Sequence, residues 1–291
     1  MRVTHFATAT SPPAQGQRGG QARVKALMNG GGPGESEFEM HHVHYAGPGN
    51  TSPRHNHNFD QFRYVIKGSF EHGDFNESVP EACLGFITAG CSYGPFTNDP
   101  SSIFMVLQMA GPDGEGYSQN EENVKAMEEL SKHGTFESGF YNYVDEDGRA
   151  KKKDGWRAVY EQARGREFKA PKPRATEVIV MDPSAYNWVP LTSGIFEKLL
   201  GTFNERGTSA WMLLLEAGAE YTRNPLVREE LMFILDGDVS VNDEECLQFD
   251  TLYFAPEDSA SLRAKSQTTI LGFGLPAFAP AKSVEDRLVQ R

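Results

Sequence analysis

The sequence of 291 residues predicts an all-β protein built from two barrels, one in each half of the chain. Short apolar or alternating segments separated by turn residues recur in both halves, which is the pattern of antiparallel strands in a sandwich or barrel. A segment rich in basic residues, 149–174, lies between the two strand-rich blocks. The chain is long enough for each block to bury a core of its own, so we expect two domains.

The first block follows a segment of different composition. Residues 1–37 are rich in Gly, Pro, Gln and Ser, which predicts a flexible arm, although ARVKALM within it has the pattern of one short strand. Residues 38–117 run from FEMHHVHYA through FRYVIKGSFEHG and CLGFITAG to SIFMVLQMA, four segments of strand character. We therefore assign residues 38–117 to the N-terminal barrel.

The pattern changes after this barrel. Val124, Met127 and Leu130 recur at helical spacing within residues 118–133, and a second short helix is expected from Trp156 to Ala163. We assign 118–174 to a helical and basic linker, because a charge run is usually a solvated surface. Strand character returns in residues 175–280, the C-terminal barrel, and residues 281–291 predict a terminal helix that begins at a Ser cap.

Composition excludes several classes of function. The net charge of −12 and the isoelectric point near 5.2 disfavour nucleic-acid and anionic-membrane binding, since both surfaces are polyanions. No apolar run of membrane-spanning or signal-peptide length occurs, and the three cysteines form no CxxC pair, so we expect a cytoplasmic protein with reduced thiols. The partner expected on these grounds is a small-molecule substrate.

One segment has a spacing that carries chemistry. In GNTSPRHNHNFDQFRYVIKG, Gly49 is followed after five residues by His55, then by His57, then after three residues by Gln61, with Gly68 six residues further on. Two histidines one residue apart on a strand point to the same face, so both imidazoles can reach one ion. The segment resembles the first motif of the cupin superfamily, with Gln61 where the family has Glu. This resemblance implies double-stranded β-helix (jelly-roll) barrels, two cupin domains, with a few short helices in the linker and at the C-terminus.

The strand after the histidines alternates as well. Gln61, Arg63 and Val65 are predicted to face the barrel interior, while Phe62 and Tyr64 face the other way. A guanidinium in such a place can bind a carboxylate or enolate through paired hydrogen bonds.

The second cupin motif resembles ACLGFITAGCSYGPFTN, and the alignment puts Tyr93 at the position of the third metal-binding His. The expected metal ligands are therefore His55, His57 and Gln61, with a third imidazole still to be found. Upstream, EMHHVHYAG puts His42 and His44 on one face of a strand and His41 on the other, so His44 or His42 could complete the set. The alternative is that these histidines have ordinary structural partners.

The C-terminal half keeps the spacing without the ligands. All eight histidines lie at or before position 133, and Asn224 and Leu226 stand at the two histidine positions of a frame that runs from Gly218 through Glu230 to Gly237. A lone Glu230 cannot assemble a transition-metal site of the usual kind. We expect this barrel to be structural, packing against the first or mediating a homodimer.

The resemblance extends to bicupin ring-cleavage dioxygenases, which carry an Arg in the register of Arg63. It implies an enzyme that binds a divalent transition metal, Fe(II) first and Zn, Mn, Ni or Cu otherwise, and acts on a small organic acid or aromatic. In this hypothesis the catalytic residues are Arg63 and Tyr93, the latter as a hydrogen-bond donor or general acid, and the substrate-binding residues also include Gln61 and Gln108. No nucleotide cofactor is expected. Two alternatives stay open: a metal-free isomerase or cyclase, and a non-catalytic small-molecule-binding protein.

Overall fold

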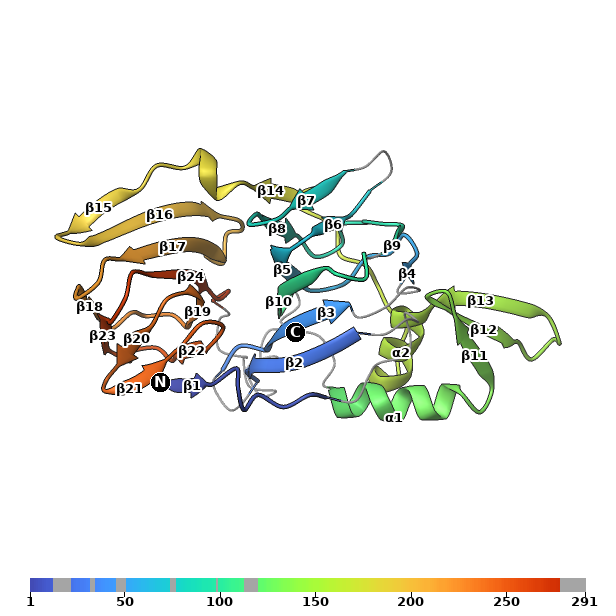
Figure 1. Ribbon diagram of the computed structural model, residues 1–291. Helices are drawn as coiled ribbons and strands as arrows, with labels where there is room; N and C mark the ends of the chain where they lie inside the picture. The colour runs from blue at the N-terminus through green and yellow to red at the C-terminus, as the bar shows by residue number, and fades with distance from the viewer. Residues whose placement is uncertain are drawn as a thin grey trace, which may run out of the picture. The chain divides into compact units, whose positions relative to one another are not determined.

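The computed structural model forms two compact units (Figure 1). It describes residues 1–12, 22–31, 35–45, 51–73, 77–97, 99–112 and 120–277. The N-terminal unit comprises Ala9–Leu27 and Glu39–Pro183, and the C-terminal unit comprises Met1–Thr8, Met28–Phe38 and Ser184–Arg291. The predicted C-terminal helix, 281–291, lies outside the described residues.

The N-terminal unit is built on a six-stranded sheet in the order β14-β8-β5-β10-β3-β2, with two short pairs, β4-β9 and β6-β7. The strands are β2 (Ala22–Asn29), β3 (Phe38–Tyr45), β4 (Thr51–Ser52), β5 (Asp60–Lys67), β6 (Ser69–Glu71), β7 (Ser78–Pro80), β8 (Leu84–Ile87), β9 (Phe96–Thr97), β10 (Ile103–Met109) and β14 (Ile179–Met181). One core cluster takes side chains from the sheet and from both short pairs, including Val65, Phe70, Phe96 and Phe104. The layers therefore enclose one interior.

Alternation along β5 decides what enters that interior. Val65 packs in the core cluster, and Arg63 donates a hydrogen bond from Nε to Gln61 Oε1 at 3.2 Å, so these three side chains share one face. Phe62 instead packs against Phe86, with 4.8 Å between ring centroids. The predicted inward and outward faces of this strand are confirmed.

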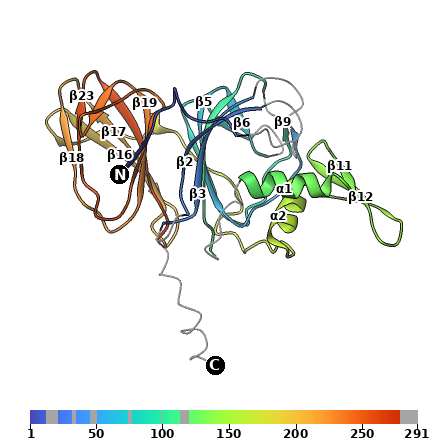
Figure 2. The same ribbon diagram turned by 90° about the horizontal axis from the view of Figure 1, so that it is seen from below.

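The segment 118–174 holds two helices, as predicted. It also holds a three-stranded sheet, which was not predicted. Its elements are α1 (Asn120–Leu130), β11 (Gly134–Glu137), β12 (Phe140–Val144), β13 (Ala150–Asp154) and α2 (Gly155–Arg164). The two helices pack against each other (Figure 2). Helix α2 begins at Asp154, whose side chain accepts a hydrogen bond from the Arg157 backbone N–H at 2.9 Å, and ends at Gly165 in the left-handed conformation. Trp156, Val159 and Tyr160 form its buried face, and the short helix expected there is confirmed.

The C-terminal unit has a seven-stranded sheet in the order β1-β22-β19-β24-β17-β16-β15 and a four-stranded sheet in the order β18-β23-β20-β21. The strands are β1 (Arg2–Thr4), β15 (Val189–Thr192), β16 (Ile195–Thr202), β17 (Ser209–Leu215), β18 (Glu220–Arg223), β19 (Glu230–Asp236), β20 (Val239–Val241), β21 (Glu244–Cys246), β22 (Thr251–Phe254), β23 (Ala260–Ala264) and β24 (Thr268–Gly274), and a 3-10 helix spans Pro183–Ala185. One cluster, with Trp211, Met232, Leu252 and Leu262 among its members, fills the space between the sheets. The described chain is thus all-β apart from short helices, as predicted.

Two strands pair with partners that are far away in the sequence. β1 pairs with β22 in the C-terminal unit, and β14, which follows the helical segment, pairs with β8 in the N-terminal unit.

Just after β1, His5 lies between two carboxylates, with Nδ1 2.8 Å from Asp250 and Nε2 3.0 Å from Glu244. Both contacts raise the pKa of His5, the hydrogen bond to Asp250 most strongly. These contacts attach the beginning of the chain to the C-terminal unit.

None of the helices in the described part of the chain is long and apolar enough to cross a membrane.

Candidate functional site

The two motif histidines and Tyr93 meet at one end of the N-terminal barrel. His55 forms an isolated antiparallel bridge with Tyr93, with backbone N–H to carbonyl distances of 3.0 and 3.1 Å in the two directions. The bridge brings the two rings to 4.4 Å between centroids, and Tyr93 is only 2% exposed. The side chain at the position of the family's third His therefore does lie beside the first His.

His57 lies in an aromatic environment. Its ring is 4.8 Å from that of His55, stacks on Phe59 at 4.5 Å and meets the edge of Trp156 at 4.5 Å. The Tyr93 hydroxyl is 3.5 Å from His57 Nδ1. Trp156 comes from helix α2, a segment that the sequence analysis assigned to a solvated linker, and its role beside His57 was missed because nothing in the local sequence signals it.

The hydrogen bonds of His55 fix which ring nitrogen carries the proton. Nδ1 lies 2.7 Å from the Pro53 carbonyl oxygen, which can only accept, so Nδ1 is the protonated nitrogen and the lone pair is on Nε2. A second contact, at 3.3 Å, joins Nδ1 to Ser52 Oγ. Metal-binding histidines usually donate their other N–H to a carbonyl or carboxylate in this way. His55 therefore has the hydrogen bond typical of a metal-binding histidine, and the second imidazole, that of His57, lies beside it with 4.8 Å between ring centroids.

Within the described residues, no cluster of three or more His, Cys, Asp or Glu side chains is placed to hold a metal ion. Gln61, predicted as a ligand, directs its carbonyl oxygen to Arg63 instead. It is better described as a partner of Arg63 than as a metal ligand.

Arg63 is a buried cation on the inward face of β5. It is 8% exposed, and its guanidinium carbon lies 4.1 Å from the centre of the Phe70 ring and 5.8 Å from that of Phe96. Among the described residues no carboxylate lies within ion-pair distance of it. Arg63 Nη1 and Gln61 Nε2 are both buried without a hydrogen-bond partner. Two donors on the inward face of β5 thus have no acceptor among the residues that the structure describes.

The prediction for His44 is not supported by the placement of β3. Val43 and Tyr45 pack against the core cluster that contains Tyr93, so the odd-numbered residues of β3 face the interior. His42 and His44 occupy the opposite face. There burial, and to a smaller extent the charges of His44 and Lys25, lower the pKa of His42 to about 4. The alternation was predicted correctly, but the face that enters the barrel was not.

The inward face of β3 carries two residues that were not predicted. Glu39 is 6% exposed, and burial raises its pKa to about 8. Burial also lowers the pKa of His41 to about 4, and His41 Nε2 lies 3.9 Å from Glu39 Oε2. On the neighbouring strand β10, Gln108 pairs with Gln61 in register and shares the face of Phe104 and Val106, which are core residues. The assignment of Gln108 to substrate binding stays a prediction.

No protein-family model and no curated protein matches the sequence. Solved structures do match across nearly the whole chain. A protein from Nostoc punctiforme that is provisionally named a dioxygenase is 12% identical, with a TM-score of 0.59, over 97% of this chain and 84% of that one. HEPD from Streptomyces albus, solved with 2-hydroxyethylphosphonate and Fe(II), is 12% identical, with a TM-score of 0.55, over 99% and 78%. Quercetin 2,3-dioxygenase from Acinetobacter baumannii is 13% identical, with a TM-score of 0.50, over 100% and 94%. The chain has the cupin fold. At these identities the likeness concerns the fold alone.

In the C-terminal unit, an arginine pairs with Glu230, the acidic residue of the motif frame. Arg223 Nε donates to Glu230 Oε2 at 3.1 Å, and the two side chains are 2% and 5% exposed. The Arg223 guanidinium also donates to the Asp258 carbonyl oxygen and lies 4.4 Å from the centre of the Phe254 ring. Glu230 is therefore paired with a buried arginine of its own unit.

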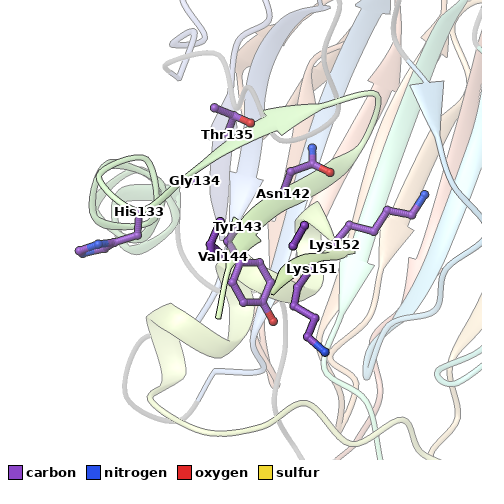
Figure 3. A pocket seen from close by; sticks show the side chains of 9 residues that line it. His133, Gly134, Thr135, Asn142, Tyr143, Val144, Lys151 and Lys152 are labelled. Carbon is purple, nitrogen blue, oxygen red and sulfur yellow. The ribbon is translucent and has the colours of Figure 1, made fainter. Parts of the chain in front are cut away.

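A surface hollow of about 500 Å³ lies on the three-stranded sheet β11-β12-β13 (Figure 3). Tyr143 and Lys151, which pair in register across β12 and β13, line it together with residues of β11 and with His133. Lys151 is paired with Asp145 at 3.5 Å. The hollow gathers no set of acid, base and nucleophile, so the barrel interior is the better candidate site.

Proposed function

We propose that the N-terminal barrel is the active site of a metal-dependent oxidoreductase of the dioxygenase kind that acts on a small organic acid. The observation that carries the proposal is the buried Arg63, whose charge meets no carboxylate among the described residues and whose Nη1 lacks a partner. Burying an uncompensated cation is costly, so such a cation in a fold of this kind is best explained by an anionic ligand.

Arg63 and Gln61 form the proposed substrate-binding pair. The hydrogen bond from Arg63 Nε holds Gln61 Oε1, which turns the amide nitrogen of Gln61 away from Arg63. Arg63 Nη1 and Gln61 Nε2 then offer two donors to a carboxylate, and a charge-assisted bond is roughly twice as strong as a neutral one. The carboxylate would orient the rest of the substrate toward the histidine end of the barrel.

The metal would be held by His55 and His57. A divalent transition ion suits imidazole ligands, and Fe(II), which is bound in the HEPD structure, is our first choice over Zn, Mn, Ni and Cu. When bound, such an ion supplies activation of dioxygen or polarisation of a substrate oxygen. Phe59, stacked on the His57 ring, and Trp156, at a steep angle to it, limit the access of water to that ring, and Tyr93, with its hydroxyl 3.5 Å from His57 Nδ1, could hold a proton beside it.

The test combines metal analysis with oxygen uptake. The purified protein, reconstituted with each of the five metals, is expected to retain close to one equivalent, and oxygen uptake should begin only when a small acid is added. Arg63→Met should keep the metal and lose the response to acid. Less than about a tenth of an equivalent of every metal would overturn the metal-dependent function. The surface variant Arg149→Met, in a strongly exposed side chain, is the matched control.

A second function is favoured by the contact between Tyr93 and His57. A phenol and an imidazole at 3.5 Å can pass a proton to a bound acid, which suits an isomerase or cyclase without metal. This alternative predicts full turnover of a small acid in the presence of a chelator and loss of turnover in Tyr93→Phe. Saturable binding of acids with no turnover under any condition would leave a non-catalytic binding protein.

A further inference from the structure

Glu39 and the pair Gln61–Arg63 lie on the inward faces of strands of the same sheet, with β10 between them. The sheet order β5-β10-β3 places Gln61, Gln108 and Glu39 on neighbouring strands, and each shares its face with core residues of one cluster. Strands are about 4.8 Å apart, so the backbones of β5 and β3 are about 10 Å apart. Side chains that reach inward from both strands therefore face the same part of the barrel interior.

Glu39 Oε2 is buried and has no hydrogen-bond partner in the described part of the chain. The imidazole of His41 is its nearest polar neighbour that the structure records, at 3.9 Å, which is too long for a hydrogen bond. Leaving a buried carboxyl oxygen without a partner is costly, so its presence requires an explanation. Its face of the barrel already holds two other unpartnered polar atoms, Arg63 Nη1 and Gln61 Nε2.

The electrostatic character of the two ends differs. Arg63 supplies a permanent positive charge, whereas burial raises the pKa of Glu39 to about 8, so Glu39 is mostly an uncharged acid at neutral pH. Burial lowers the pKa of His41 to about 4, which keeps that ring neutral as well. An uncharged carboxyl has one O–H to donate, and it suits an oxygen acceptor without net charge.

We propose that Glu39 is a specificity-determining residue that donates a hydrogen bond to a carbonyl or hydroxyl oxygen of the ligand. The ligand class is then a small oxo- or hydroxy-carboxylic acid, whose carboxylate is bound by Arg63 and Gln61 while its second oxygen meets Glu39. The inference rests on the proposed acid site and deepens it by naming the substrate class. A simple monocarboxylic acid of the same length would leave Glu39 unsatisfied.

The experiment measures affinity by calorimetry, in a chelator so that metal plays no part. Matched pairs of a small oxo-carboxylic acid and the plain carboxylic acid of equal carbon number are titrated into the full chain. Wild type is expected to prefer the oxo acid by about five- to tenfold, the effect of one hydrogen bond. Glu39→Leu should abolish this preference while it still binds the plain acid, and Glu39→Gln, whose amide can donate, should keep most of it. Glu71→Leu, at an exposed position of β6, is the control and should behave as wild type.

The outcomes separate the two proposals. If wild type binds both acids equally, or if Glu39→Leu keeps the preference, the role of Glu39 is wrong while the acid site stands. If neither acid binds to wild type, or if Arg63→Met binds them as well as wild type does, the acid site itself is wrong and this inference fails with it. Thermal melting of each variant shows whether it is folded, and Glu39→Gln, the nearly isosteric variant, keeps the test valid if Glu39→Leu does not fold.

Discussion

Replacing Arg223 by Met tests whether the buried ion pair between Arg223 and Glu230 stabilises the C-terminal unit. The substitution preserves most of the side-chain volume and removes the charge, which leaves Glu230 buried without its partner. Burial already raises the pKa of Glu230 against the opposing effect of Arg223. Breaking a buried pair from one side costs about 3–5 kcal/mol, because the remaining group is desolvated and uncompensated. In a unit of this size such a loss lowers the melting temperature by roughly 10 °C.

Urea denaturation followed by tryptophan fluorescence measures the loss of stability in the C-terminal unit. The chain has three tryptophans, and only Trp211 lies in the core cluster of the C-terminal unit. In a background with Trp156→Phe and Trp188→Phe, the fluorescence therefore reports on the core of the C-terminal unit alone. The double variant Arg223→Met, Glu230→Met should recover most of the lost stability, since an apolar replacement of a whole buried pair is often neutral.

The exposed pair Arg263–Glu220 is the matched control in the same unit. Its atoms are 3.5 Å apart, and its side chains are 70% and 62% exposed. Arg263→Met is expected to cost at most about 1 kcal/mol. If Arg223→Met also costs less than about 1 kcal/mol, Glu230 is satisfied by something other than Arg223 and the reasoning is refuted.

Three further predictions concern the metal, the pH and a helix. Alanine at His55 or His57 should abolish bound metal in elemental analysis while Tyr93→Phe retains it; loss of metal in Tyr93→Phe would make the phenol a ligand. Because its carboxylate contacts raise the pKa of His5, their contribution to stability is full below about pH 6.5 and is lost as the pH rises through the raised value. Denaturation midpoints of wild type should therefore fall relative to His5→Gln across that range, and parallel midpoints would exclude the effect. Asp154→Ala removes the cap of α2 and should cost about 1 kcal/mol in denaturation, against no change for an exposed carboxylate such as Asp147.

The spacing of residues predicted the cupin fold and the inward face of β5. Both depend on local geometry: the motif fixes how far apart the residues lie along the chain, and the pleat fixes which of them share a face. The meeting of Tyr93 with His55 follows from the same logic, because the second motif aligned Tyr93 with a position that pairs with the first motif. The inward face of β5 follows from local strand geometry, whereas the fold and the position of Tyr93 are what the resemblance to the two cupin motifs implies.

The features that sequence reasoning missed depend on tertiary contacts. On β3 the alternation was correct, but Val43 and Tyr45 rather than His42 and His44 face the core. Alternation alone leaves the two faces equivalent, and each face of β3 mixes two apolar residues with two polar ones, so the sequence holds no signal that separates them. Trp156 reaches His57 through a helix about a hundred residues further along the chain, which no local pattern reveals.

The two units differ in the side chain that contacts their buried arginine. Replacing the amide of Gln61 by a carboxylate tests this difference. In the C-terminal unit Glu230 neutralises Arg223, whereas in the N-terminal unit Gln61 offers Arg63 only an amide oxygen. Gln61→Glu should place a carboxylate oxygen where Oε1 already accepts from Arg63 Nε. Arg63 would then have a buried ion pair like the one between Arg223 and Glu230. The charge that attracts an acid would then be compensated inside the protein, so we expect the affinity for small carboxylic acids to fall at least tenfold.

Calorimetric titration of Gln61→Glu with a small acid checks this, beside Gln162→Glu, which adds the same charge at an exposed position of α2. Because Glu is also the residue that the cupin motif uses as a metal ligand, metal affinity should be measured on the same samples. Weakened acid binding with unchanged metal affinity would mean that the new carboxylate pairs with Arg63, as the geometry predicts. Unchanged acid binding with tighter metal binding would mean that the new carboxylate turns to the histidines and leaves Arg63 unpaired. Unchanged acid binding with unchanged metal affinity would mean that Arg63 is not the group that binds the acid.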